Sequence, residues 1–324
     1  MKIGKLPNSL LDKIVIEPIN KHSVERSEVI LKPSIGEDCS ALNMGDNICL
    51  LSTDPITGAV ENIGKLAIHI NTNDIASSGG EPVGIMVTAL FPPSVTENEI
   101  SKIVTDLYVE AEKVNVVILG GHTEITDAVN KPVLSCTVIG KTKKLIPSGG
   151  AKIGDSVVMT KYAAMEGTAI FASDRADKLK NVDKSVIENA KKFSENLSVI
   201  KEGKIAAGAG AHAMHDVTEG GILGACWEVA DCGGLGVEVY CDSIPVKEET
   251  KIICSELGVD HLRLISSGSM LIVCEKGEEM VRALKDEGIN AAVIGKITEK
   301  GRYVVRNGER YELEEPGADE LYMV

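Results

Sequence analysis

The 324-residue sequence contains no uninterrupted run of 18 or more apolar residues, the length that a membrane-spanning helix needs. Its N-terminal stretch, MKIGKLPNSLLDKIVIEP, also lacks the continuous apolar segment and small-residue cleavage site of a secretory signal, because Asp12 and Lys13 interrupt the apolar residues. We therefore expect a cytoplasmic protein without a membrane span.

Basic residues are outnumbered by acidic ones, with 34 Lys and Arg against 48 Asp and Glu and a net charge of −14. Such a charge repels a polyphosphate backbone, so we expect no nucleic-acid partner. Binding of a small anion such as ATP is still compatible with this negative net charge, because Mg²⁺ held by carboxylates reverses the local charge. Clustered acidic residues are therefore of interest.

The eight cysteines include no C-x-x-C pair. In a chain without a secretory signal, such scatter favours buried thiols over disulfides or zinc ligands. His212 and His215 are three residues apart but have no third ligand at a spacing typical of zinc. The sequence also has no Walker A loop, no G-x-S-x-G, no H-E-x-x-H and no kinase signature, which excludes the commonest nucleotide and hydrolase families.

The length suits two domains, each with its own core. Lys, Pro and Gly gather between residues 140 and 156, so we place a boundary there, with domains at 1–148 and 149–324. Helices and strands are predicted in alternation, which indicates layered α/β or α+β domains. The second half is predicted to contain strands at 155–160 and 269–275 and helices at 184–200 and near 278–288.

A helix is predicted over 97–114 from the spacing of its apolar residues, and Thr96 with Glu99 forms a capping box at its start. The run VVIL that follows predicts a buried strand that ends at the motif GGHTEIT, residues 120–126. This motif places His122 beside two glycines. A tight turn with solvated polar residues is the simplest interpretation of it alone.

Two other regions combine polar residues with a predicted element. In the helix that starts at Ile63, Asn71 and Asp74 share one face, which is either a solvent-facing stripe or part of a polar site. Further on, HDVTEGG leads into an apolar helix, whose start is either a site for an anion or an ordinary N-terminus capped by Asp216 or Thr218.

Seven motifs, read in order, resemble the aminoimidazole ribonucleotide (AIR) synthase superfamily: GEDCSAL, LSTDPITG, HINTNDIASSGGEP, GGHTE, GDSVVMTKYAAMEGTAI, HAMHDVTEGGILGACWEVA and DSIPV. The resemblance spans nearly the whole chain. It implies a two-domain fold, with an N-terminal α+β domain whose sheet pairs in a homodimer and a C-terminal layered α/β domain.

The resemblance also implies binding of ATP with Mg²⁺ across that dimer, since carboxylates from several segments suit the oxygen-rich coordination of Mg²⁺. The metal ligands would be Asp38, Asp54, Asp74 and Asp216. The nucleotide would also contact Gly36, Asn71, Gly121, Thr123, Thr218 and Gly220. The residues implied in catalysis are Asp74, Asp216 and Glu124.

One departure from the family pattern lies in GGHTE. Relatives commonly have an acidic residue after the glycine pair, where this chain has His122. A neutral imidazole is a poorer Mg²⁺ ligand than a carboxylate. Either Glu124 replaces the acid or the site holds fewer metal ions, and we favour Glu124.

Within the superfamily, GKLP and DSIPV look most like the HypE-type hydrogenase maturation factors. The resemblance implies that ATP phosphorylates an amide-like or other small acceptor, either free or protein-bound. The last cysteine is Cys274, whereas HypE-type proteins carry one at the C-terminus, and Ser267 precedes a glycine where relatives often have an acid. Two alternatives stay open: a small-molecule kinase resembling thiamine monophosphate kinase, and a non-catalytic nucleotide-binding partner protein.

Overall fold

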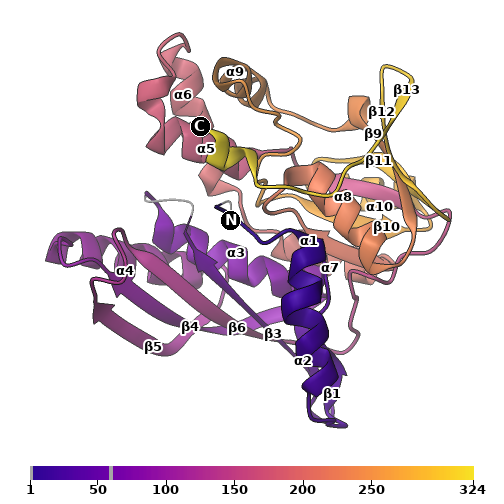
Figure 1. Ribbon diagram of the computed structural model, residues 1–324, viewed down its shortest axis with the longest axis horizontal. Coiled ribbons are helices and arrows are strands. Elements are labelled where there is room, and N and C mark those ends of the chain that lie inside the picture. The colour runs from indigo at the N-terminus through magenta and orange to yellow at the C-terminus, as the bar shows by residue number, and fades with distance from the viewer. Residues whose placement is uncertain (1–2, 58–60) are drawn as a thin grey trace.

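Two mixed α/β units, each built on one β-sheet, form the chain in this computed structural model, which describes residues 3–57 and 61–324 (Figure 1). The first sheet has the strand order β1-β2-β3-β6-β4-β5, in which only β4 and β5 run parallel to each other. Its strands are β1 (Val29–Leu31), β2 (Ser40–Asn43), β3 (Ile48–Ile56), β4 (Glu81–Phe91), β5 (Val117–Ile125) and β6 (Val133–Thr142).

Helix α3 (Ile63–Ser77) covers one face of this sheet, and all of its residues except Lys65 are buried. It packs against β3 and β6 on one side and against α4 (Glu97–Lys113) and α7 (Ile200–Gly208) on others. Asn71 and Asp74 are therefore 0% and 4% exposed. The interpretation of this polar face as a solvent-facing stripe is wrong, and buried polar groups of this kind require partners inside the protein.

Helix α4 begins as predicted. The Thr96 side chain accepts a hydrogen bond from the Glu99 amide, and the Glu99 carboxylate accepts one from the Thr96 amide, which confirms the capping box. Ile103 and Leu107 are buried toward α3. The two helices approach closely at Gly64, where a Cβ atom would lie 2.6 Å from the Ile103 carbonyl oxygen.

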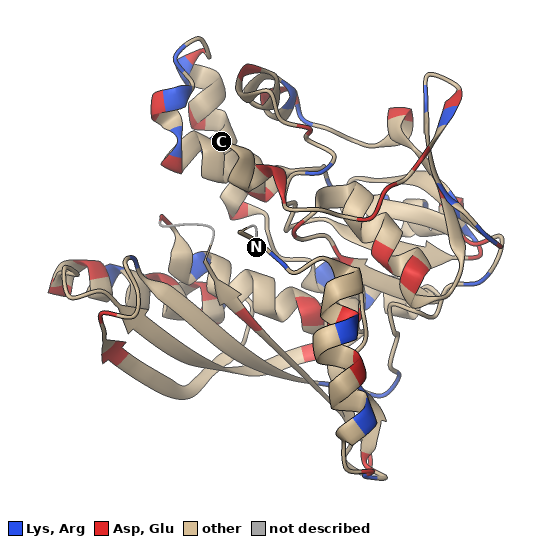
Figure 2. Cartoon of the chain, viewed as in Figure 1, with Lys and Arg blue, Asp and Glu red and all other residues tan. Residues whose placement is uncertain are grey.

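Strand β5 differs from the prediction in two respects. It continues through GGHTE to Ile125 instead of ending before the motif, and it is exposed along its whole length instead of buried. The cause is its place in the sheet, because β5 is an edge strand that pairs only with β4. Figure 2 shows few charged residues along the strands of this sheet.

The second sheet has the order β13-β12-β9-β11-β7-β10-β8, in which only β12 and β9 are parallel. Its strands are β7 (Ser156–Thr160), β8 (Ala213–Asp216), β9 (Gly236–Tyr240), β10 (Met270–Cys274), β11 (Ala291–Thr298), β12 (Arg302–Arg306) and β13 (Glu309–Glu312). The predicted strands at 155–160 and 269–275 are thus confirmed. Residues 143–155, which include the expected domain boundary, join the two sheets.

Helices cover both faces of the second sheet. Along β7, Val157 packs in one cluster with helix α8 (Gly221–Cys232), whereas the next residue, Val158, packs in another with α7 and α10 (Gly277–Asp286). This alternation follows from the pleat of a strand, in which successive side chains point to opposite faces. The layered α/β arrangement of this half is as predicted. Two further helices of this half, α5 (Met165–Asp174) and α9 (Glu248–Leu257), pack against each other.

The helix predicted over 184–200 is interrupted. Helix α6 (Lys184–Lys191) continues as a 3₁₀ turn, η3 (Lys192–Glu195), and α7 starts only at Ile200. In the gap, the Lys161 ammonium group donates hydrogen bonds to two backbone carbonyl oxygens, those of Asn196 at 3.3 Å and Ser198 at 2.5 Å. These carbonyl groups therefore have a partner outside the helix.

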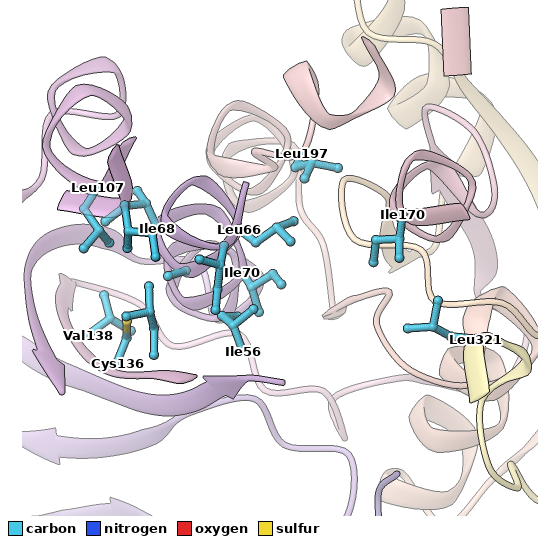
Figure 3. Packing of buried hydrophobic residues seen from close by; sticks show 14 of the residues in the cluster. Ile56, Leu66, Ile68, Ile70, Leu107, Cys136, Val138, Ile170, Leu197 and Leu321 are labelled. Atoms are coloured by element: carbon cyan, nitrogen blue, oxygen red, sulfur yellow. The ribbon is translucent and has the colours of Figure 1, made fainter. Parts of the chain in front are cut away.

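One hydrophobic cluster crosses from the first domain into the second. Figure 3 shows Leu66 and Ile70 of α3 together with residues from distant segments. Leu197, Ile170 of α5 and Leu321 of the C-terminal 3₁₀ turn η5 (Glu320–Met323) belong to the same cluster. Burial of apolar surface at about 25 cal/mol per Å² then holds the two domains against each other.

The N-terminal segment lies across the junction of the domains (Figure 1). It contains the short helix α1 (Asn8–Leu11), a π-helical turn η1 (Asp12–Ile16) and helix α2 (Glu17–His22). The Asn8 side chain donates a hydrogen bond to Glu228 of α8, and the Ser9 amide donates one to Glu315. Residues at the start of the chain thus line the space between the two sheets.

The glycine pair in β5 provides a test of this strand's conformation. Gly120 and Gly121 both have positive φ, +145° and +151°, but an added Cβ would meet nothing within 4 Å at Gly120 and would lie 1.8 Å from the Val87 carbonyl oxygen at Gly121. Gly121→Ala should therefore lower the free energy of unfolding by about 1–3 kcal/mol more than Gly120→Ala does, which is the usual cost of overpacking. Equal losses in chemical denaturation would contradict the placement of β5 against β4.

Candidate functional site

Four acidic residues from four separate segments meet at one cavity between the domains. Its volume is about 530 Å³. Asp38 precedes β2, Asp54 lies near the end of β3, Asp74 lies on α3, and Asp216 ends β8. Figure 2 shows acidic positions on α3 and α8 near this junction. These are the four residues that the sequence resemblance assigned to metal binding.

Hydroxyl and amide groups hold the acids of the first domain in place. Ser52 Oγ donates a hydrogen bond to Asp74 at 2.5 Å, and Ser77 Oγ donates one to Asp38 at 2.6 Å. The Asp54 backbone amide donates to the Asn71 side-chain oxygen at 3.1 Å. Asn71 thus holds the backbone of β3 at Asp54, the residue whose side chain lines the cavity.

His215 connects the two domains through the cavity wall. Its Nδ1 lies 2.6 Å from an Asp38 oxygen, and its Nε2 lies 3.1 Å from a Glu228 oxygen. Burial opposes a charge on the ring, but these two carboxylates raise the pKa of His215 well above its ordinary value. A protonated ring donates from both nitrogen atoms, so both Asp38 and Glu228 receive a charge-assisted hydrogen bond.

The other three acids, Asp54, Asp74 and Asp216, all have raised pKa values. Burial, with a contribution from Asp38, raises the pKa of Asp216 to about 8. Burial and the nearby Asp216 carboxylate raise the pKa of Asp74 well above its usual range, and burial also raises the pKa of Asp54. Buried carboxylates that repel one another are stabilised by a shared cation.

The donor set fits a hard divalent cation. Candidate ligand atoms of Asp38, His215 and Asp216 all lie within 4.8 Å of one another. Asp216 Oδ2 is buried without a hydrogen-bond partner among the described residues, so it is available for coordination. Because His215 uses both ring nitrogen atoms, the available donors are carboxylate oxygens, which Mg²⁺ prefers.

The loop and helix residues expected around a nucleotide occupy different places. Gly36 and Thr218 line the cavity together with Lys5, whose ammonium group lies 3.3 Å from Thr218 Oγ1. Gly220 lies outside this lining and starts α8 with a φ of +85° and no side-chain cap. Neither Asp216 nor Thr218 therefore caps this helix. The anion at its N-terminus is the Asp319 carboxylate, which accepts a hydrogen bond from the Gly220 amide at 2.7 Å.

Gly121, Thr123 and Glu124 lie away from the cavity within one chain. Asp54 on β3 pairs with Cys136, which pairs with Val87, which pairs with Gly121. Three strand spacings separate Asp54 from Gly121, or roughly 14 Å at 4.8 Å each. Glu124 is exposed and lies 3.4 Å from His122. A single chain thus does not bring the GGHTE motif to the four acids.

Several residues in or beside the cavity were given no role in this site by the sequence, where His215 was considered only as a zinc ligand. They are Lys5, Ser52, Ser77, His215 and Glu228. Ser52 and His215 lie next to predicted site residues in the sequence, in the motifs STD and HD. Their position in these motifs could therefore have indicated that they belong to the site. Glu228 lies in the middle of an apolar helix, and only the packing of α8 against β8 shows its role.

The cysteine prediction is confirmed for the described residues. None of the eight forms a disulfide, and six are buried. Cys274 lies in β10, where burial raises the pKa of its thiol to about 11. His212 contacts Asp155 and Lys152 rather than His215, so the two histidines do not share a site. No helix in the described part of the chain has both the length and the apolar character needed to cross a membrane.

Family comparison assigns both halves of the chain. Residues 36–142 match the family described as AIR synthase related protein, N-terminal domain, and residues 152–307 match its C-terminal domain. A protein of Methanocaldococcus jannaschii, provisionally named a hydrogenase expression/formation protein, is 26% identical over 313 residues, or 93% of this chain and 90% of its own. Carbamoyl dehydratase HypE of Escherichia coli K12 is 26% identical over 255 residues, or 76% and 74% of the two chains.

Solved structures share the fold. The HypE–HypF complex gives a TM-score of 0.78 at 21% identity, covering 94% of this chain and 100% of that one. AaThiL bound to AMPPCP and TMP also gives 0.78, at 19% identity and 98% coverage of each chain. HypE in complex with ATP gives 0.68 at 18% identity, covering 99% and 98%. With family matches over both halves, the chain belongs to the AIR synthase related family and has its two-domain fold.

Proposed function

We propose that the protein is an ATP-dependent enzyme of the HypE type that phosphorylates an amide-like or other small acceptor with Mg²⁺ and ATP. The observation that carries this proposal is the convergence of Asp38, Asp54, Asp74 and Asp216 on one cavity. Relatives named carbamoyl dehydratase and the structure of HypE with ATP support it.

Mg²⁺, when bound, would neutralise the charge of the triphosphate. The four acids would hold it, and the hydrogen bonds from Ser52 and Ser77 would keep Asp74 and Asp38 aimed at the cavity. His215 would fix Asp38 from the opposite side. Phosphoryl transfer depends more on alignment and electrostatic stabilisation than on a strong base, which fits a site of acids, hydroxyls and glycines.

In the proposed step, an amide-like oxygen of the acceptor attacks the γ-phosphorus of ATP. A new oxygen–phosphorus bond forms as the bond to the β,γ-bridging oxygen breaks, and ADP leaves. One N–H proton is lost as the phosphorylated intermediate forms, and loss of phosphate together with the second N–H proton then gives a dehydrated product. Lys5, which lies in the cavity wall, would interact with the phosphoryl oxygens.

A kinase that resembles thiamine monophosphate kinase is the second candidate, because AaThiL matches with the same TM-score as the HypE–HypF complex. Turnover that ends in free phosphate and no phosphorylated product supports the dehydratase type, whereas a stable phosphorylated product supports the kinase. ATP binding without any turnover would indicate a non-catalytic nucleotide-binding protein.

We also propose a homodimer formed through the uncovered face and edge of the first sheet. Contiguous apolar exposure is rare on monomers unless it serves an interface. The exposed apolar residues of β4 and β5 are Val83, Met86, Val117, Ile118, Leu119 and Ile125. Gly121, Thr123 and Glu124 lie on the same strand, so a dimer is the arrangement in which they would reach the acidic cavity of a second copy.

Asp74→Asn tests the metal and nucleotide assignment, with Cys274→Ser as the control. The first substitution removes a charge from the cavity, whereas the second changes a buried thiol in β10. Calorimetric titration with Mg²⁺ and AMPPCP should show at least a tenfold weaker affinity for Asp74→Asn, since tenfold corresponds to about 1.4 kcal/mol. Equal affinities for the two variants would remove the assignment.

His215→Asn tests the bridge between the domains. Without the ring, Asp38 and Glu228 lose their shared cation, and breaking a buried ion pair costs about 3–5 kcal/mol of unfolding free energy. The Mg²⁺ concentration at half-maximal nucleotide binding should also rise. His22→Asn, at an exposed position on α2, is the control and should change neither quantity. The bridge is refuted if both variants unfold at the same denaturant concentration.

Met86→Glu tests the dimer. A charge in the middle of the uncovered sheet face should shift the molar mass from that of a dimer to that of a monomer in light scattering. It should also reduce turnover if Glu124 acts across the interface. Met44→Glu is the matched control, because Met44 is also exposed but precedes β3 at the far side of the sheet. An unchanged mass for Met86→Glu would exclude this interface.

A further inference from the structure

The two domains hold one stretch of backbone from opposite sides. This stretch, residues 196–199, leads into α7 and is called the connecting segment. Asn73 of α3 binds it from the first domain, and Lys161, which follows β7, binds it from the second. We infer that Asn73 and Lys161 are positioning residues, which fix the acids of one domain relative to those of the other. The acids concerned are Asp74 and Asp216, and the inference rests on the metal site of the proposed function.

The Asn73 side chain makes two hydrogen bonds to the connecting segment. Its Nδ2 donates to the Leu197 carbonyl oxygen at 2.8 Å, and its Oδ1 accepts from the Val199 amide at 2.9 Å. Asn73 is 0% exposed, and both polar atoms of its amide are bonded to protein backbone rather than directed at a ligand. The next residue on α3 is Asp74. The two bonds therefore fix the helix at the position beside this acid.

Lys161 binds two other backbone groups of the same segment. Its Nζ donates to the carbonyl oxygens of Asn196 at 3.3 Å and Ser198 at 2.5 Å. It also lies 2.7 Å from Glu202, which is 2% exposed, so the ammonium group is held by a buried ion pair. The carbonyl groups alternate in direction, because the one between Asn196 and Ser198 faces the first domain. Both domains thus hold the segment through consecutive peptide groups.

The backbone of Lys161 has a conformation that is uncommon for a residue with a side chain. Its φ of +52° lies in the left-handed region. Asn290 holds this conformation from both sides, since its carbonyl oxygen accepts from the Lys161 amide at 2.7 Å and its side chain donates to the Lys161 carbonyl oxygen at 3.2 Å. Such a conformation persists only where the surrounding contacts enforce it. The second domain therefore fixes the position from which Lys161 reaches the connecting segment.

The second sheet links Lys161 to Asp216. Asp216 at the end of β8 pairs with Met270 at the start of β10. The Met270 amide donates to the Thr160 hydroxyl at 3.0 Å, and Thr160 immediately precedes Lys161. Both Thr160 and Met270 are 0% exposed. A continuous set of buried contacts therefore runs from Asp216 through the connecting segment to Asp74, separately from the cavity that the two acids line.

The spacing of these two acids matters because they come from different domains and repel each other. Burial and the nearby Asp216 carboxylate raise the pKa of Asp74. Two carboxylates that share a cation need a fixed separation, which their mutual repulsion opposes when no cation is bound. Mutation of groups that orient metal ligands typically weakens metal binding about 10–100-fold. We expect Asn73 and Lys161 to act in this way although neither is a ligand.

Asn73→Ala tests the inference, because it removes both hydrogen bonds to the connecting segment without changing the charge of the cavity. The probe is Mn²⁺, which takes the same oxygen ligands as Mg²⁺, and its binding to the full chain is followed by electron paramagnetic resonance of the free ion. We expect about tenfold weaker Mn²⁺ binding. Lys161→Met combined with Glu202→Gln removes the ammonium group without leaving an unpaired carboxylate, and it should weaken Mn²⁺ binding similarly.

Thr250→Val is the matched control. Thr250 is 0% exposed, like Asn73, and its hydroxyl bonds to Thr168 at 3.0 Å between α9 and α5, away from the connecting segment. This variant should lower the melting temperature and leave Mn²⁺ affinity unchanged. A second readout needs no metal: hydrogen exchange of the Val199 amide should become faster in Asn73→Ala.

Two outcomes would overturn the inference. The first is wild-type Mn²⁺ affinity in both test variants despite lower melting temperatures, because their role would then be structural alone. The second is unchanged exchange of the Val199 amide in Asn73→Ala. If Asn73→Ala does not fold, the variant at Lys161 and Glu202 decides the outcome. Failure of the proposed function is distinguishable, because Mn²⁺ binding without turnover of ATP refutes that function and leaves the inference standing, whereas a wild-type chain that binds no Mn²⁺ refutes both.

Discussion

The structure depends on how four carboxylates are kept together in a buried space between two domains. Unpaired, such charges would repel one another and lose their hydration, at a cost of several kcal/mol. His215 offsets this cost for Asp38 by bridging it to Glu228, and the Ser52 hydroxyl offsets part of it for Asp74. Asp216 is left with a buried oxygen that lacks a partner among the described residues, which is the feature most directly explained by a bound cation.

The burial of helix α3 and the packing of the two domains are consistent with this requirement. Helix α3 is buried because its polar face must reach the cavity while its apolar residues pack on the sheet and against the second domain. The same arrangement leaves the other face of the first sheet uncovered. A single cluster of apolar residues continues across the junction, so the acids of the two domains are held in register by packing as well as by the His215 bridge.

Sequence patterns predicted local features, and the family resemblance selected four acids that line one cavity, but neither predicted the surroundings of these acids. The capping box at Thr96 and the strand around Cys274 depend on neighbours in sequence, and both were predictable. Glu228 and Asp319 act only through tertiary contacts, which periodicity does not encode. The sequence predicts a buried strand at β5 because an apolar run looks alike in a core strand and in an exposed edge strand. The place of β5 at the edge of the sheet, three strand spacings from β3, also explains why Glu124 is far from Asp54 within one chain.

The most direct test of the account is the melting temperature of the protein with Mg²⁺ and ATP compared with Mg²⁺ alone. Ligand at a hundred times its dissociation constant adds about 2.7 kcal/mol of stability, which is easily detected. The account predicts a clear upward shift that requires both components and disappears with a chelator. No shift at millimolar ATP would show that the four acids do not form a nucleotide site.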